Sequence, residues 1–166
     1  SDRATRRHGA ASGSTTSTNL FRMPIRNTTR DTVLATREQW AVTVDARTRG
    51  LLDRDSLEPG EALVISPCNS VHMFGMRFPL DVLFVDADGR VLRAIEDLRP
   101  RQLTRIYLRA RHTIELPVGV IASSGTRPGD QLDLGAVPET AGGSNTLLWA
   151  LAGLVSAVAL LGLLAS

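Results

Sequence analysis

The stretch between residues 67 and 81 holds the side chains that are best suited to chemistry. Four soft or borderline metal ligands, Cys68, His72, Met73 and Met76, fall within nine residues, and such a set suits Cu(I). On an extended strand Met73 would point away from the other three, because successive side chains alternate between faces. One hypothesis is therefore a soft-metal site with Cys68, His72 and Met76 as its ligands.

A thiol nucleophile is a second hypothesis for the same stretch. Cys68 would attack a substrate with His72 or His112 as its base. Asp81 would orient that base, which is the arrangement of a thiol hydrolase. The sequence gives Cys68 neither a helix N-terminus nor an oxyanion hole, and free cysteines are commonly buried. Packing in a core or loop is the third interpretation, and we assign no catalytic residue.

Two acids, Asp81 and Glu115, lie beside apolar runs. Asp81 directly precedes the run 82–85, and Glu115 stands between Ile114 and Leu116, where alternation puts it on the opposite face from both. A carboxylate in such a position either accepts backbone hydrogen bonds and pairs with an arginine, or faces a pocket. The candidate ligand-binding residues are His72, Arg77, Asp81 and Glu115.

Short apolar runs separated by turns must position these residues. We expect strands over 62–66, 81–86, 91–95, 105–108, 113–116 and 131–134, a hairpin at 86–89, and two short strands around a turn at 27–31. Apolar spacings of three and four predict a helix between 37 and 54, and a strand over 40–44 followed by a shorter helix is the alternative. These elements predict an α+β fold: a small, mainly antiparallel sheet that curls into a barrel-like domain with about one short helix.

The chain divides into four parts. Residues 1–20 are small and polar, which is typical of a disordered tail, and they contain no visible export signal. Residues 21–135 form the globular β-rich domain, and 136–146 form a linker rich in small residues. The apolar segment that follows runs for about 18 residues without charge, the lower end of what crosses a hydrocarbon core of ~30 Å. We expect 147–165 to be a transmembrane helix.

The flanks of this segment set its orientation. Trp149 lies near its start, where an amphipathic ring prefers the membrane interface. The Arg-bearing side belongs in the cytoplasm, so we expect a membrane-anchored protein whose globular domain is cytoplasmic. Gly153 and Ala157 form a small-xxx-small pair that could let two such helices approach closely.

Charge and cysteine content narrow the classes of function. All 19 basic residues are arginine and the net charge is +2. A nucleic-acid surface needs basic residues clustered on one face with stacking aromatics or a known module, and neither is visible, so no nucleic-acid partner is expected. The single cysteine excludes an intrachain disulfide framework and a zinc site of several thiolates. The cofactor is unknown.

Several motifs in register resemble one family. They are Arg-Gly-Leu-Leu-Asp-Arg at 49–54, Met73 with 79–86, then 88–91, 115–119 and Gly129-Asp130. This series resembles the domain of unknown function 192 family over about 27–134, in a branch with Cys and Val-His before Gly-Met-Arg-Phe-Pro. The commoner pattern has Lys-Asn-Thr after Met73 and Trp in place of His72. The resemblance implies a small, β-rich α+β domain of prokaryotic origin, often associated with the envelope, and it brings no established activity.

The expected function is a non-enzymatic, membrane-tethered binding or accessory module. Its partner, a small molecule or a protein, would bind a surface that surrounds Cys68, His72, Met76, Arg77 and Asp81. Copper binding and thiol hydrolysis are the alternatives.

Overall fold

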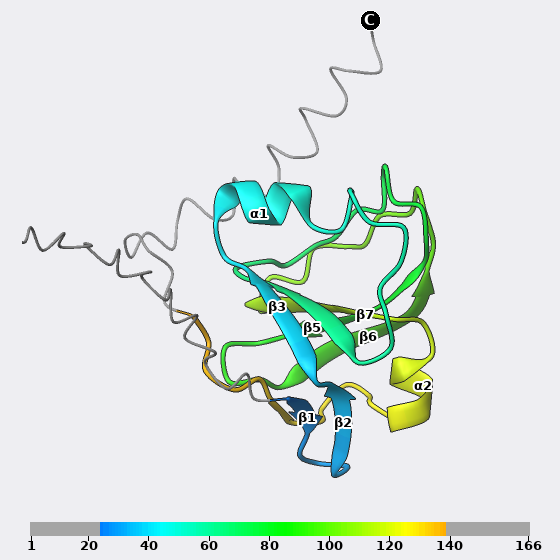
Figure 1. The fold of residues 1–166 in the computed structure, drawn as a ribbon. Coiled ribbons are helices and arrows are strands. Elements are labelled where there is room, and N and C mark those ends of the chain that lie inside the picture. The colour runs from blue at the N-terminus through cyan, green and yellow to red at the C-terminus, as the bar shows by residue number, and fades with distance from the viewer. Residues whose placement is uncertain (1–23, 139–166) are drawn as a thin grey trace, which may run out of the picture.

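Two β-sheets and two short helices make up the part of the chain that the structure describes. This structure is a computed structural model and describes residues 24–138 (Figure 1). The strands are β1 (Ile25–Asn27), β2 (Thr32–Ala35), β3 (Arg37–Ala41), β4 (Glu61–Ile65), β5 (Leu80–Val85), β6 (Val91–Leu98), β7 (His112–Leu116) and β8 (Leu132–Asp133). The helices are α1 (Val44–Arg49) and α2 (Val120–Ser124).

The larger sheet has the strand order β3-β4-β7-β5-β6. Its strand pairs are antiparallel except for β3 and β4, which run parallel. The strands β5 and β7 are buried along their whole length, because protein covers both faces of the sheet. The continuous apolar run of β5 is the pattern expected for a strand in that position.

The first core lies between the larger sheet and the smaller sheet, whose order is β2-β1-β8. Figure 1 shows β1 and β2 at the end of the molecule opposite α1. We call this side of the larger sheet its first face. The core there includes Ile25, Leu34, Val64, Leu83, Val85, Ile114, Leu116, Ile121 and Leu132.

The second core lies on the second face of the larger sheet. Connecting segments cover this face together with α1. Side chains from these segments pack on alternate residues of β4 and β5, and the core includes Leu51, Leu57, Leu63, Ile65, Val71, Met73, Val82 and Phe84.

The hairpin predicted at 86–89 is confirmed between β5 and β6. The Asp86 carboxylate accepts hydrogen bonds from the backbone N–H groups of Asp88 (3.0 Å) and Arg90 (2.9 Å). Gly89 has φ +83°, and a Cβ at this position would lie 2.5 Å from the carbonyl oxygen of Leu132. The turn therefore requires glycine.

One prediction of local structure is confirmed and another needs correction. The strands β1 and β2 flank the turn at 27–31. Between 37 and 54 the prediction of one helix is wrong, and the alternative, a strand followed by a shorter helix, is correct in order but not in bounds: the strand β3 covers Arg37–Ala41 instead of 40–44, and α1 begins at Val44. The Thr43 hydroxyl begins that helix by accepting a hydrogen bond from the Ala46 N–H.

Three other expectations need correction. The prediction of a strand over 105–108 is wrong, because these residues are irregular, and Ile106 and Leu108 are exposed. The two sheets have open strand orders and form no closed barrel within 24–138. The fold is mostly β with two short helices, one more than predicted.

The expected tail (1–20), most of the linker and the expected transmembrane helix (147–165) lie outside the described residues. Within the described part, neither helix has the length and apolar character needed to span a bilayer.

Candidate functional site

Glu115 is a buried acid on the strand β7, at the centre of the second face. It stands opposite Leu63 of β4 and Val82 of β5, two members of the second core. Its neighbours Ile114 and Leu116 belong to the first core, so the side-chain alternation predicted from the sequence is confirmed. Glu115 is only 5% exposed, and burial raises the pKa of its carboxyl to about 7.

No hydrogen bond within 24–138 contributes to the pKa of the Glu115 carboxyl, which burial alone raises. Thr113, two residues before it, faces the same core opposite Ile65 and Phe84. Its hydroxyl donates to the carbonyl oxygen of Cys68 at 3.2 Å, which fixes the segment after β4 over this face. The polar end of the Glu115 side chain thus lies in apolar surroundings with one cysteine nearby.

Cys68 is that cysteine, and its thiol donates a hydrogen bond to the Ser70 carbonyl oxygen at 3.1 Å. Burial raises the pKa of the thiol; hydrogen bonds with Thr113 and Ser70 oppose this rise, and the negative charge of Glu115 adds to it. The positive charge of Arg47, on α1, lowers the pKa of the thiol slightly. Burial lowers the pKa of Arg47 itself. A protonated thiol of this kind is a poor nucleophile.

The two histidines offered as a base for Cys68 make no hydrogen bond with it. His112 lies on the first face, where its Nδ1 is 2.8 Å from the Ser66 hydroxyl and its ring contacts Trp40 edge-on at 5.9 Å. Burial, with help from the charge of Arg111, lowers the pKa of His112 to about 4.

His72 pairs through its backbone with Leu103, and its ring lies 5.8 Å from that of Phe74. Burial lowers the pKa of His72, and its buried Nδ1 has no hydrogen-bond partner in the described structure.

Asp81 lies on the first face, away from Glu115. Its carboxylate accepts three backbone N–H groups, from Asp97 (3.1 Å), Gly119 (3.0 Å) and Ile121 (2.9 Å). The last two begin α2, so the buried Asp81 fixes this helix against the end of β5. Of the two roles predicted for Asp81, the structure gives backbone capping, without an arginine partner within 24–138.

Arg77 and Met76 occupy the edge of the second core. Arg77 is exposed and forms an ion pair with Asp55, whose hydrogen bond and charge raise the pKa of the guanidinium. Met76 is half-buried and packs with Cys68 against the second core. Among the described residues no three His, Cys, Asp or Glu side chains are grouped as metal ligands, so the copper hypothesis depends on the thioether of Met76.

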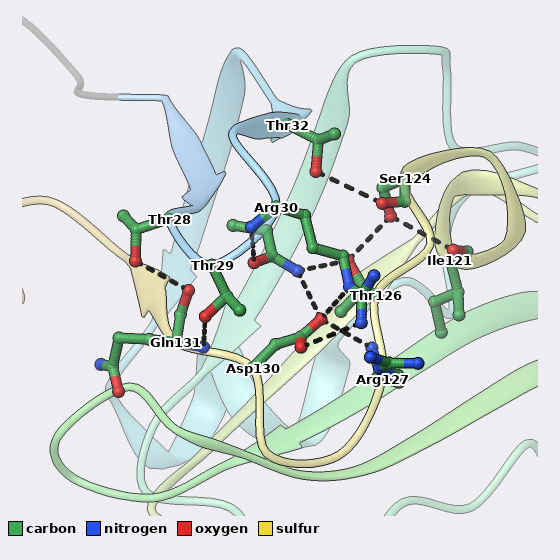
Figure 2. A network of polar contacts seen from close by, with 11 residues as sticks. Thr28, Thr29, Arg30, Thr32, Ile121, Ser124, Thr126, Arg127, Asp130 and Gln131 are labelled. Carbon is green, nitrogen blue, oxygen red and sulfur yellow. Dashed lines mark hydrogen bonds and ion pairs between the residues drawn. The ribbon is translucent and has the colours of Figure 1, made fainter.

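A larger polar network, which the sequence did not single out, joins the first hairpin to the segment 124–131 (Figure 2). The buried Asp130 carboxylate accepts from the Asn27 amide (2.9 Å), the Arg30 guanidinium and the Arg127 N–H (3.0 Å). Burial opposes ionisation of Asp130, but these hydrogen bonds and the charge of Arg30 lower its pKa. Thr126 accepts the second amide hydrogen of Asn27. The polar groups of this network are hydrogen-bonded to one another, which indicates a structural role: they hold the first hairpin against the segment 124–131. In the sequence, only the Gly129-Asp130 turn pointed to this network.

The comparisons with known proteins agree with this fold. A model of the DUF192 family, described as uncharacterized ACR, matches residues 25–134. A crystal structure of a protein of unknown function from Novosphingobium aromaticivorans superimposes with a TM-score of 0.58 and 24% identity, covering 66% of this chain and 83% of that one. A second, described as a putative transcription regulator from Sinorhizobium meliloti, gives 0.52 and 26% and covers 58% and 79%. No match was found among curated proteins.

Proposed function

Because this chain belongs to the DUF192 family, whose members are described as uncharacterized, we propose a function from its own residues: a non-enzymatic binding module, tethered to a membrane. The observation that carries the binding role is the Glu115 carboxyl: the residue is only 5% exposed, and no hydrogen bond within 24–138 opposes the effect of burial on its pKa. A ligand that donates a hydrogen bond to this carboxyl would supply such a bond.

The cost of leaving this carboxyl unsatisfied supports a ligand. A buried polar group without a partner costs about 1–3 kcal/mol, whereas an apolar residue at the centre of β7 would pack between Leu63 and Val82 without that cost. Ionisation is also accessible near neutral pH, because the pKa of Glu115 is about 7. The ligand class that fits is a small molecule with a cationic or neutral N–H donor, and Thr113 and Cys68 border the position that it would take.

The surroundings of Cys68 favour binding over thiol catalysis. Its thiol is held by the Ser70 carbonyl and its pKa is raised, so little thiolate is present at neutral pH. Neither His72 nor His112 is hydrogen-bonded to it.

Tethering is proposed from residues 147–165, whose apolar length is sufficient for one membrane span. The Arg-bearing domain would then face the cytoplasm. Membrane partitioning of the full chain, lost on deleting 147–166, is the expected result. A full chain that stays in the aqueous fraction would refute the tether and leave the ligand proposal standing.

The ligand proposal is tested with small probes of matched size. We expect guanidinium and methylammonium, but not acetate, to shift the amide NMR signals of Cys68, Thr113 and Glu115 in the isotope-labelled full chain, with the millimolar affinity of a fragment of few atoms. Glu115→Gln should abolish these shifts. Glu96→Gln, at an exposed acid of β6, is the matched control and should keep them. Equal responses in wild type and E115Q, or no response in wild type, would refute a site at Glu115.

Copper binding is the second candidate, and the buried Nδ1 of His72 without a partner favours it. It predicts stoichiometric Cu(I) in protein loaded under reducing conditions and loss of that copper in His72→Ala. Copper retained by H72A would exclude His72 as a ligand.

A further inference from the structure

Large apolar side chains are exposed on the segment between β6 and β7. We call residues 99–111 the arginine loop. Within it Leu103 is 63% exposed, Ile106 57% and Leu108 86%, and Phe74 from the neighbouring segment is 39% exposed. Isolated apolar side chains are common on protein surfaces, but a group of this kind on paired segments indicates a docking surface.

The exposed side chains stand on an ordered backbone. The arginine loop follows the segment 69–76 through four backbone hydrogen bonds of 2.8–2.9 Å, which are Met73 N–H to Gln102, Thr104 N–H to Val71, Tyr107 N–H to Asn69 and Arg101 N–H to Met73. The Tyr107 ring packs on Phe84 of the second core at 4.5 Å. The loop therefore presents its leucine and isoleucine side chains outward from a fixed framework.

The arginine loop and the segment that it follows contain basic residues and no acid. The loop contains five arginines, at 99, 101, 105, 109 and 111, and neither 98–114 nor 66–80 contains an aspartate or glutamate. Among the described residues, Arg99 pairs with Asp97 and the other four arginines of the loop form no ion pair. The sequence did not predict that these arginines and apolar side chains share one surface, because it did not predict the backbone pairing of the arginine loop with 69–76.

Aliphatic side chains mixed with unpaired arginines match the boundary of an anionic bilayer. The apolar groups enter the acyl region and the guanidinium groups stay among the lipid headgroups. Single-stranded nucleic acid would instead need a series of exposed aromatic rings for base stacking, whereas this surface exposes Phe74 alone and Tyr107 is turned inward against Phe84. We propose that the arginine loop docks on an anionic membrane surface. This inference is independent of the ligand at Glu115.

The test places a fluorescent reporter on the loop of the full chain. Leu108→Cys is labelled with NBD and reconstituted in vesicles of phosphatidylcholine alone or with one quarter phosphatidylglycerol. Val33→Cys is the matched control, because Val33 is 46% exposed on β2 of the other sheet. Wild type, whose only thiol is Cys68, is taken through the same labelling to measure its background.

The expected result is a blue shift and higher emission of NBD at position 108 in the anionic vesicles only, with no change at position 33. Each of Arg101→Gln, Arg105→Gln and Arg109→Gln should reduce the docking equilibrium about fivefold, and high salt should reverse it. This readout is separate from the tether, which is measured by partitioning into phosphatidylcholine alone.

Three outcomes would overturn the proposal. The first is an identical emission at position 108 in both vesicles. The second is a response to RNA or duplex DNA in detergent and none to anionic lipid, which would assign the surface to nucleic acid. The third is a response in detergent that depends on protein concentration and not on lipid, which would assign it to a second copy of the chain.

Discussion

Replacing Glu115 with glutamine should stabilise the domain at pH 8 and change its stability little at pH 4. Burial raises the pKa of Glu115 from 4.5 to about 7, so the folded protein keeps a proton on this carboxyl where the unfolded chain has lost it. The resulting stability is fully present below pH 4.5 and is lost as the pH rises through 7. At 1.36 kcal/mol for each pKa unit, this difference makes the ionised wild type less stable by about 3 kcal/mol at pH 8.

Urea unfolding of the full chain in mild detergent measures this effect. Tryptophan fluorescence reports it, because Trp40 packs against the first core. The free energy of unfolding of Glu115→Gln minus that of wild type should grow between pH 4.5 and 7 and then level off. Glu96→Gln, at an exposed acid on β6, should give a difference that does not vary with pH.

Two results would refute the reasoning about Glu115. If Glu115→Gln is less stable than wild type at pH 8, the carboxylate is ionised and stabilised by a cation in the folded protein. If the difference is the same at pH 4 and pH 8, the carboxyl titrates alike in the folded and unfolded states.

Three further substitutions test the framework. Asp81→Asn should lower the free energy of unfolding by about 2 kcal/mol, because a charged acceptor of three backbone N–H groups becomes neutral; an unchanged urea midpoint would contradict the capping role. Gly89→Ala should cost at least about 1 kcal/mol, since φ is +83° and the new Cβ would meet a carbonyl oxygen at 2.5 Å, and a fully stable variant would show that the turn relaxes freely. Burial lowers the pKa of His112 to about 4, so its contribution to stability is lost as the pH falls from 6.5 through 4. In urea unfolding the stability of His112→Gln relative to wild type should therefore rise between pH 7 and pH 4.5, and a difference that does not vary with pH would mean that His112 is protonated in the fold.

Local patterns in the sequence predicted the elements whose neighbours are close along the chain. The Asp-Gly turn at 86–89 joins two apolar runs, and a two-strand pairing follows from local geometry. The parallel pairing of β3 with β4 could not be predicted in this way, because it depends on contacts distant in sequence. The short helix α2 was missed because Asp81, 38 and 40 residues before Gly119 and Ile121, supplies the acceptor for its first N–H groups.

The faces on which the candidate residues lie were predicted in part. Alternation along β7 correctly put the Glu115 side chain on the other face of the sheet from Ile114 and Leu116. That Asp81 would face the other side of the sheet depends on the register of β5 against β7, in which Asp81 pairs with Leu116, and one sequence carries no signal for that register. The apolar run at 105–108 was predicted as a strand because its exposure could not be foreseen.

The strand β7 carries His112 on one face of the sheet and Glu115 on the other. The effects of these two groups on the number of bound protons cancel when the domain unfolds in mild acid. Between pH 4.5 and 6.5 the folded protein holds a proton on Glu115 and none on His112, whereas the unfolded chain holds one on the histidine and none on the acid. Unfolding in this interval therefore moves one proton from residue 115 to residue 112 and exchanges almost none with the solvent. Since stability varies with pH only when the two states bind different numbers of protons, these two groups buffer the domain against mild acid, although each alone would make it sensitive.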